Sequence, residues 1–513
     1  MDLHLSETYL LFPVKNDTQP ADFCRVSVAV SGTVVREFDI ALSETPAWFA
    51  HLDVREWAGE TATIEAVGVE LKPAIQRLIT PSSALWQEES IYSEPLRPQL
   101  HFSSRRGWLN DPNGLVYADG EYHLFYQHNP YGWGWGNMHW GHAVSADLVH
   151  WRELPIVLYP PRYGDMAFSG GAVLDNDNTS GWRAGDGSLI VGSFTSTARG
   201  ECMIYSNDGG RSFTEYDANP VIRHAGRDPR PLWYAAGGTW VMALYDEEGG
   251  ERKITFHSSP NLKEWTYHSS IPGFYECPDL FELPCGDKSY WVLTGASSDY
   301  MVGHFDGKVF EPLTPMLKGH LGKGFYAAQT YTNDPKGRVV QIGWFQADSP
   351  GMPFNQAMSL PLTLSLCETA DGPRLAWTPV DELAVLRDGS DQSAELASFA
   401  SELVELRAEF GAVDVAFTVR GATISYEAAT QELVVNGHRA PAPLVEGKQR
   451  ITVYVDRTTL EVFASNGLTF VPMPYIAPAG DRSVSVSGGP VDDLQVYRLR
   501  SCWAELGCPS VTR

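Results

Sequence analysis

Short stretches that alternate between apolar and polar residues fill most of this 513-residue sequence. Gly, Asp, Asn and Pro bound them, and examples are RVSVAV (25–30), ATIEAV (62–67) and RITVYVD (450–456). A period of two is typical of a β-strand with one buried face, and helical periodicity is scarce along the chain. The pattern therefore predicts an all-β protein built from many short strands.

A longer repeat is superimposed on this pattern. Five segments begin with a Gly or Asp turn and continue as an apolar, β-branched or aromatic strand: GEYHLFYQ (120–127), GSLIVGSF (187–194), GTWVMALY (238–245), DKSYWVLTG (287–295) and GRVVQIGWF (337–345). Most of them start about 50 residues apart, which is typical of propeller blades with four strands each. A second element, a turn that leads to an aromatic strand, follows several of them, as in SADLVHW (145–151) and SPNLKEW (259–265). We therefore predict a five-bladed β-propeller over residues 98–375.

The flanking regions lack this period. Residues 1–90 contain alternating strands and predict a small accessory domain that resembles a β-sandwich, with a linker at PSSALWQEESIYSEPLRPQ (81–99). Residues 385–500 contain short alternating strands separated by turn signals, which predict a C-terminal β-sandwich. The expected order is thus a small β domain, a propeller and a sandwich.

Charge and composition narrow the possible partners. The net charge of −25 disfavours nucleic acid and anionic membranes and is compatible with a neutral substrate. Aromatic residues make up 12% of the chain, including 16 Trp, which fits either stacking on sugar rings or an aromatic-rich β core. We find no apolar run long enough for a transmembrane helix.

The first residues of the chain and its cysteines indicate in which cellular compartment the protein is expected. MDLHLSETYLLFPV has no basic segment followed by an apolar one, so we expect a cytoplasmic protein or a secreted protein without its signal. The seven cysteines form no paired CxxC motifs, which indicates neither a zinc site nor a disulfide framework. Reduced thiols are the simpler interpretation, and a Cys502–Cys508 pair stays open. No metal or organic cofactor is expected.

Three acidic residues occupy equivalent places in the repeat. Asp111 in RGWLNDPNGLVY, Asp228 in AGRDPRPLW and Glu276 in GFYECPDLF each precede a repeated strand by about ten residues. Inner strands of a propeller converge on one channel, so the three carboxyl groups are predicted to meet there. A cluster of like charges usually has a role.

The alternative is that each acid has a local structural role. Asp111 lies in a D-P-N-G sequence that commonly forms a hairpin turn. The other two acids could pair with neighbouring Arg or Lys side chains such as Arg227, Arg230 and Lys288. Both interpretations remain open at this point.

A pair of carboxyl groups is sufficient for glycoside hydrolysis, one as nucleophile and one as acid and base. The neighbours of Glu276 are mostly apolar, which is expected to raise its pKa and to suit an acid. Amide donors around Asp111 are expected to keep it ionised, and Arg227 is expected to keep Asp228 ionised and oriented.

Four motifs, WLNDPNG, FSGG, RDP and EC, occur in this order on the five-fold repeat. Over about residues 98–500 the chain resembles glycoside hydrolase family 32, which includes invertases, levanases, inulinases and related fructosyltransferases. The resemblance implies a five-bladed propeller followed by a β-sandwich. The N-terminal segment is similar to a small accessory β domain on some bacterial members.

The resemblance also implies roles for individual residues. Asp111 would be the nucleophile, Glu276 the acid and base, and Asp228 the stabiliser of the transition state. The fructose pocket would be lined by Asn110, Gln127, Trp135, Phe168, Ser169, Arg227 and Trp344. Trp135, Trp344 and Phe168 could instead belong to the propeller core, and Gln127 could serve a strand end.

We therefore predict a retaining glycoside hydrolase that cleaves terminal β-D-fructofuranosyl units from levan, inulin or sucrose through a fructosyl-enzyme. Its partner would be a fructose-containing oligo- or polysaccharide, with neither nucleic acid nor membrane involved. A transfructosylase or an invertase would use the same three acids. A propeller that cleaves arabinan or xylan is a further enzymatic alternative, and a catalytically silent fructan-binding propeller is the alternative from another class.

Overall fold

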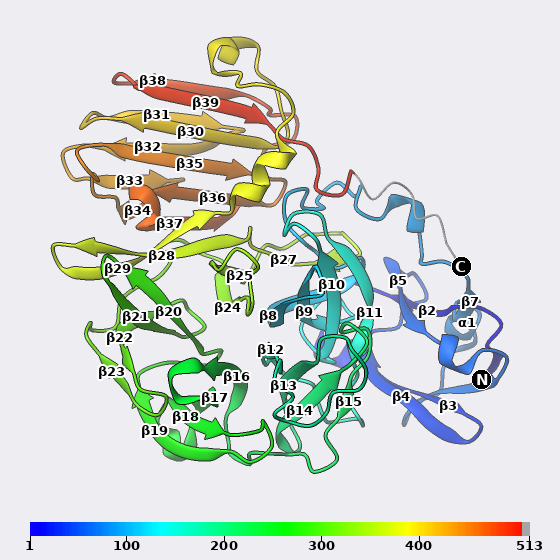
Figure 1. Ribbon diagram of the computed structural model, residues 1–513. Coiled ribbons are helices and arrows are strands. Elements are labelled where there is room, and N and C mark those ends of the chain that lie inside the picture. Colours follow the sequence, from blue (N-terminus) through cyan, green and yellow to red (C-terminus); the bar gives the residue numbers. More distant parts are fainter. Residues whose placement is uncertain (505–513) are drawn as a thin grey trace.

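The computed structural model describes residues 1–504, and strands make up nearly all of its regular structure (Figure 1). The helical elements are short, such as α1(Pro73–Gln76) and the 3-10 turn η6(Asp381–Leu386). No helix within residues 1–504 is long and apolar enough to cross a membrane. Cys508, the candidate partner of Cys502, lies outside the described residues. The predicted all-β class is confirmed.

Five sheets are arranged around one axis, as in a propeller (Figure 1). Their innermost strands are β8(Gly107–Ala118), β12(Ala172–Leu174), β16(Arg227–Tyr234), β20(Asp279–Cys285) and β24(Phe325–Thr330). Their second strands are β9(Glu121–Asn129), β13(Ile190–Ser196), β17(Thr239–Asp246), β21(Lys288–Thr294) and β25(Val339–Phe345). The five repeated segments of the sequence coincide with these second strands, and the five-bladed propeller is confirmed.

The outer half of each blade completes the sheet. The third strands are β10(His139–Ser145), β14(Gly200–Ser206), β18(Lys253–Ser259), β22(Tyr300–Phe305) and β28(Leu362–Thr369). The outermost strands are β11(Arg152–Leu158), β15(Thr214–Glu215), β19(Thr266–Pro272), β23(Phe310–Pro312) and β29(Gly372–Pro379). The second repeated element of the sequence forms the turn between the third and outermost strands. In the first blade the Asp147 carboxylate closes this turn by accepting the backbone N–H of Val149 and of His150.

Hydrogen bonds between neighbouring inner strands close the ring around the axis. Each blade is linked to the next by at least one such contact: Gly114 N to Gly170 O, Gly171 N to Pro229 O, Arg230 Nε to Asp279 Oδ1, Thr330 N to Asp279 Oδ2 and Thr332 N to Leu115 O. The chain also returns to the first blade, where β26(Phe354–Asn355) pairs in parallel with β8. The inner strands are therefore held in fixed positions relative to one another.

The C-terminal part is a sandwich of two sheets. One sheet contains β37(Thr469–Pro474), β36(Thr459–Ala464), β35(Gln449–Val455), β30(Val404–Phe410) and β39(Asp493–Arg498). The other contains β34(His438–Pro441), β33(Glu432–Val435), β32(Ala422–Glu427), β31(Val415–Val419) and β38(Val484–Gly488). Alternate side chains of both sheets form one apolar core, as expected for a sandwich.

The N-terminal part has two small sheets of its own. They contain β1(Asp2–His4), β6(Thr61–Ala66), β3(Cys24–Val30) and β4(Thr33–Ile40) in one, and β5(Trp48–Asp53), β2(Tyr9–Val14) and β7(Thr80–Ser82) in the other. Figure 1 shows these sheets beside the first blade, next to β11. The limits of the three predicted domains stay predictions.

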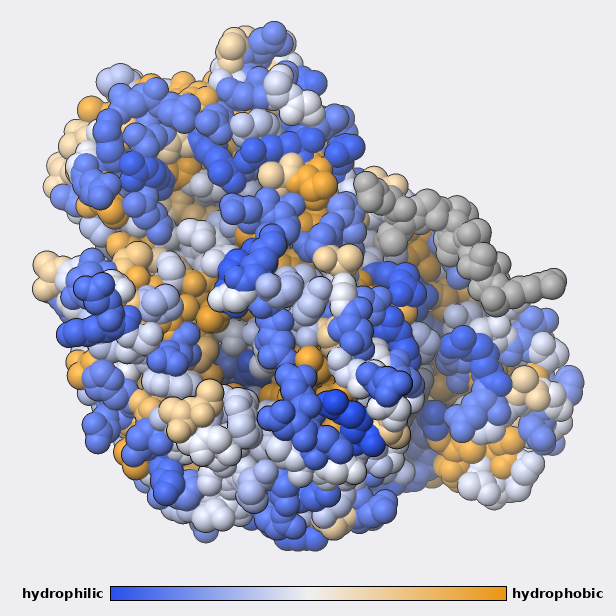
Figure 2. Space-filling model, viewed as in Figure 1, coloured by the Kyte–Doolittle hydropathy of each residue, from blue (hydrophilic) through white to orange (hydrophobic). Residues whose placement is uncertain are grey.

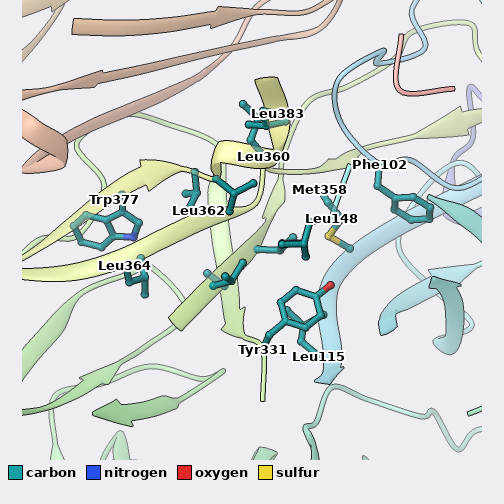
Figure 3. Close-up of a cluster of buried hydrophobic side chains, with 14 of the residues drawn as sticks. Phe102, Leu115, Leu148, Tyr331, Met358, Leu360, Leu362, Leu364, Trp377 and Leu383 are labelled. Carbon is teal, nitrogen blue, oxygen red and sulfur yellow. The ribbon is translucent and has the colours of Figure 1, made fainter. Parts of the chain in front are cut away.

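The propeller and the sandwich share one hydrophobic core. Figure 3 shows Leu115 of β8, Leu362 of β28 and Trp377 of β29 in this core, which continues to Phe463 and Phe470 of the sandwich. The surface in Figure 2 is mostly hydrophilic, in keeping with the net charge of −25. The shared core joins the sandwich firmly to the fifth blade.

Candidate active site

Asp111 lies inside a strand and not in a hairpin turn. The D-P-N-G sequence belongs to β8, whose pairing with β9 shifts register between Leu109 and Pro112 and again between Asn113 and Val116. Such bulges release residues from the ladder and redirect their side chains. Gly114 is required here, because its φ is +54° and an added Cβ would lie 2.9 Å from the Phe125 ring. The turn expected from local sequence is therefore an irregular inner strand.

The Asp111 carboxyl is held from both sides. Ser169 Oγ donates to Oδ2 at 2.7 Å, and Asn110 Nδ2 donates to Oδ1 at 3.1 Å. Asn110 is itself fixed, because the Trp108 indole N–H donates to its Oδ1 at 2.9 Å. Burial nevertheless raises the pKa of Asp111, and these hydrogen bonds offset it only in part. The amide donor expected beside Asp111 is present in Asn110, and its hydrogen bond lowers the pKa against the larger effect of burial.

Asp228 sits at a strained point of β16. Its φ is +66°, and its backbone N–H donates to Thr195 Oγ1 at 2.9 Å. Its Oδ2 accepts the backbone N–H of Cys277 at 2.9 Å, and the Cys277 thiol lies 3.5 Å from this oxygen and 3.6 Å from Asp111 Oδ2. One thiol therefore bridges two of the three acids.

Arg227 and Asp228 are adjacent in sequence but are not hydrogen-bonded to each other. Burial, followed by the nearby charges of Glu276 and Asp111, raises the pKa of Asp228 well above its usual value. Arg227 Nε is 3.9 Å from Asp228 Oδ2, too far for a hydrogen bond. The prediction that Arg227 orients Asp228 is therefore wrong, although the charge of Arg227 lowers the pKa of Asp228.

Arg227 pairs with Glu276 instead. Its Nε and Nη2 donate to Glu276 Oε2 at 2.9 and 2.7 Å, and the Tyr326 hydroxyl donates to Glu276 Oε1 at 2.6 Å. Glu276 lies shortly before β20, and the adjacent Cys277 contacts both of the other acids. Its immediate partners are a cation and a phenol, so the expected apolar surround is also wrong.

Tyr326 is the functional candidate that the sequence analysis missed. It lies at the start of β24, the inner strand of the fifth blade, and it precedes a repeated strand by about ten residues, as the three acids do. This spacing could have identified it. The pattern that singles out the three acids is one of carboxyl groups, which a phenol does not share.

Backbone strain is concentrated at this site. Asp228, Glu276, Cys277 and Ala327 all have positive φ, between +33° and +66°. For residues other than glycine this conformation costs about 1–3 kcal/mol each, and it is commonly found at functional sites. The fold therefore holds the acids in place at some expense of stability.

Aromatic side chains surround the acids. Trp135 is 55% exposed and contacts Phe168 edge to face, with ring centroids 6.0 Å apart. Trp344 is half-buried, contacts Trp108 and Tyr326 edge to face at 5.8 and 6.0 Å, and donates its indole N–H to a glutamine of the next loop. The alternative that Trp135 belongs to the core is wrong. These rings form a wall suited to the apolar faces of a sugar.

Gln127 is placed behind this wall. Its side chain is 2% exposed, and its Nε2 donates to Ala167 O at 2.9 Å. It therefore supports the segment that carries Phe168 and Ser169, as the strand-end alternative expects.

Within residues 1–504 no group of three or more His, Cys, Asp or Glu side chains is arranged to hold a metal ion.

A pair of carboxyl groups, one as nucleophile and one as acid and base, is the usual equipment of a glycoside hydrolase, and here three such groups converge from different blades of a propeller. The model of the Glycosyl hydrolases family 32 N-terminal domain matches residues 101–379, and the chain belongs to glycoside hydrolase family 32. The levanase of Bacillus subtilis (strain 168) is 36% identical over 493 residues, which cover 81% of this chain and 72% of that protein. The extracellular exo-inulinase of Aspergillus niger is 31% identical over 519 residues, which cover 80% of this chain and 96% of that protein.

A solved structure agrees with the fold. The crystal structure of exo-inulinase from Aspergillus awamori matches with a TM-score of 0.72 at 28% identity, over 80% of this chain and 100% of that chain. The family resemblance inferred from the four motifs is thus confirmed.

Proposed function

We propose that this protein hydrolyses terminal β-D-fructofuranosyl units of levan, inulin or sucrose with retention of configuration. The observation that carries the proposal is the convergence of Asp111, Asp228 and Glu276 from three different blades beside exposed aromatic rings. Relatives named levanase and exo-inulinase support the choice of fructosyl substrates.

Asp111 is the nucleophile in this proposal. Ser169 and Asn110 hold its two oxygens, which restricts the carboxylate to one orientation. In the first step a bond forms between Asp111 and the anomeric carbon of fructose while the glycosidic C–O bond breaks. Rigid placement matters because the reacting atoms must lie about 3–3.5 Å apart.

Glu276 transfers the proton. It protonates the departing glycosidic oxygen, and in the second step it accepts a proton from the water that cleaves the fructosyl-enzyme. Arg227 and Tyr326 contact different oxygens of Glu276 and so fix the plane of its carboxyl group. They are positioning residues for the acid.

Asp228 binds the sugar. Its Oδ2 is occupied by the Cys277 backbone N–H, which leaves Oδ1 for the hydroxyl groups of fructose. Burial and the nearby charges of Glu276 and Asp111 raise its pKa, because ionising a third carboxyl group beside two others is costly. As positive charge develops on the fructosyl ring, the negative charge of the Asp228 carboxylate stabilises the transition state.

Chromatography of the products tests this function. The purified protein is incubated separately with levan, inulin and sucrose, with the Asp111→Ala variant as control. We expect free fructose from the first time points without a ladder of oligomers, and no product from the variant. Oligomers or transfer products at early times would overturn exo-hydrolysis, and equal activity of the variant would overturn the assigned nucleophile.

A further inference from the structure

We propose that the N-terminal sheets act as a brace that positions Trp135 at the rim of the substrate site, with Asn137 as the positioning residue. The proposal rests on the function proposed above, because it concerns how the substrate is held. The loop between β9 and β10 carries Trp135 and lies against the N-terminal sheets.

The Asn137 side chain pairs with a strand edge of the N-terminal part. Its Oδ1 accepts the backbone N–H of Asp39 at 2.9 Å, and its Nδ2 donates to Asp39 O at 2.8 Å. Asp39 lies in β4, which is the edge strand of its sheet. Asn137 also donates to Asn129 Oδ1 at 3.1 Å, so its amide joins β4 to the base of the loop. Its φ is +41°, in the left-handed region that asparagine tolerates.

The other end of the loop is anchored in the same domain. The Tyr131 ring is 1% exposed and stacks on Phe38 of β4, with centroids 3.8 Å apart and planes at 16°. It belongs to the hydrophobic core of the N-terminal sheets, although it comes from the propeller. The loop between Tyr131 and Asn137 is therefore held at both ends by residues that precede the propeller.

The brace reaches a second rim loop. Asn16 of the N-terminal part donates to Met352 O at 2.8 Å, and Trp133 donates its indole N–H to Phe354 O at 3.0 Å. Two residues further on, Gln356 accepts the indole N–H of Trp344 at 3.1 Å. The N-terminal part thus contacts the loop that carries Trp135 and the loop that holds Trp344.

The composition of the first loop explains why it needs support. The segment YGWGWGN (131–137) alternates glycine with tryptophan, and glycine gives the backbone many accessible conformations. A free loop would have to be ordered when substrate binds, which weakens affinity. With the brace, Trp135 is already in place on Phe168. Loss of the brace should therefore raise KM and leave kcat nearly unchanged.

The test compares Asn137→Ala with Asn436→Ala. Asn436 also has positive φ and accepts a backbone N–H, from Thr423 at 2.9 Å, but it lies on the sandwich. We expect Asn137→Ala to raise KM for inulin roughly fivefold or more at similar kcat, and Asn436→Ala to match the wild type. An unchanged KM in Asn137→Ala would overturn the proposal.

A double-mutant cycle separates positioning from general loosening. If Asn137 acts through Trp135, adding Asn137→Ala to Trp135→Ala produces no further rise in KM. Fully additive effects would overturn the proposed route.

A second pair of variants changes Asp39, the backbone partner of Asn137, instead of Asn137 itself. Asp39→Pro lacks the N–H that Asn137 accepts, and an edge strand tolerates proline where its N–H faces outward. Asp39→Ala keeps this N–H and is the control. A higher KM in Asp39→Pro than in Asp39→Ala supports the brace, and equal values contradict it.

Backbone amide hydrogen exchange of residues 131–137 provides a readout that needs no activity. Faster exchange of this segment in Asn137→Ala is expected, and unchanged exchange would overturn the brace. A wild-type protein that releases no fructose would instead refute the proposed function, so the two failures are distinguishable.

Discussion

Carboxyl groups are buried in two regions of the molecule. One is the channel mouth, defined by Asp111, Asp228 and Glu276, and the other is the junction between the propeller and the sandwich. The two regions differ in how a cation is placed beside the acids. At the junction His101 lies between two acids, with Nδ1 2.8 Å from Asp456 and Nε2 3.7 Å from Glu461. At the mouth Arg227 lies within hydrogen-bonding distance of only one of the three acids, Glu276.

The pKa values follow this difference. At the junction hydrogen bonds to both acids raise the pKa of His101 to about 9 against the effect of burial, and contacts with His101 help to lower that of Asp456, whereas burial raises that of Glu461. At the mouth the pKa values of Asp111 and Asp228 are raised, since burial and like charges dominate. The junction is arranged for stability, whereas the mouth keeps its acids reactive at some cost in stability.

The largest expected effect is on activity. Asp111→Asn should lower kcat by about 10⁴-fold or more, as removal of a catalytic nucleophile does. Its Tm should stay equal or rise, because one of three crowded acids is gone. Sucrose assays and thermal unfolding measure both quantities. A clear fall in Tm with substantial remaining turnover would mean that Asp111 is structural.

At the junction, substitution of a charged residue should lower stability and leave activity nearly unchanged. His101→Gln leaves Asp456 and Glu461 buried without a cation, so the free energy of unfolding should fall by about 3–5 kcal/mol. kcat and KM measured at low temperature should stay close to wild type. His150→Gln removes a more exposed pair with Asp147, and should change stability by about 0–1 kcal/mol. Equal effects of the two substitutions in denaturant titrations would contradict the contrast.

The junction also predicts a pH dependence of stability. The pKa of His101 rises from 6.5 to about 9 on folding, so its contribution is complete below about pH 6.5 and is lost as pH rises through about 9. The stability difference between wild type and His101→Gln should therefore shrink between pH 6 and pH 10. A constant difference over this range would show that His101 is neutral in the folded protein.

A smaller effect concerns the acidic limb of the pH–rate profile. The Ser169 hydroxyl lowers the pKa of Asp111, so Ser169→Ala should move the acidic limb of kcat/KM to higher pH. Ser212→Ala, which removes a similar hydroxyl contact to the exposed Asp208, is the control. A limb that stays in place, or moves to lower pH, would mean that another group controls it.

The sequence predicted the fold and the three acids because both depend on a repeat. Inner strands that start at the same offset must meet on one axis, so Asp111, Asp228 and Glu276 could be brought together without coordinates. The partner of Arg227 could not be foreseen in this way. Glu276 is 49 residues away in the next blade, and the adjacent Asp228 was the nearer candidate in sequence.

Contacts between domains were also beyond the sequence. His101 and Asp456 are 355 residues apart, and no repeat relates them. The pairing of Asn137 with the backbone of Asp39 depends on how two domains pack, because an asparagine in a glycine-rich loop looks like an ordinary turn residue. Periodicity predicts features that recur along the chain. Contacts that occur once, such as these two, leave no periodic signal in the sequence.

Trapping the fructosyl-enzyme tests the central claim most directly. Glu276→Ala is incubated with β-D-fructofuranosyl fluoride, whose leaving group needs no proton, and the protein is examined by mass spectrometry. The account predicts that one fructosyl unit accumulates on the peptide that contains Asp111, because the second step lacks its base. A fructosyl unit on Asp228 or elsewhere, or no adduct despite consumption of the fluoride, would contradict it.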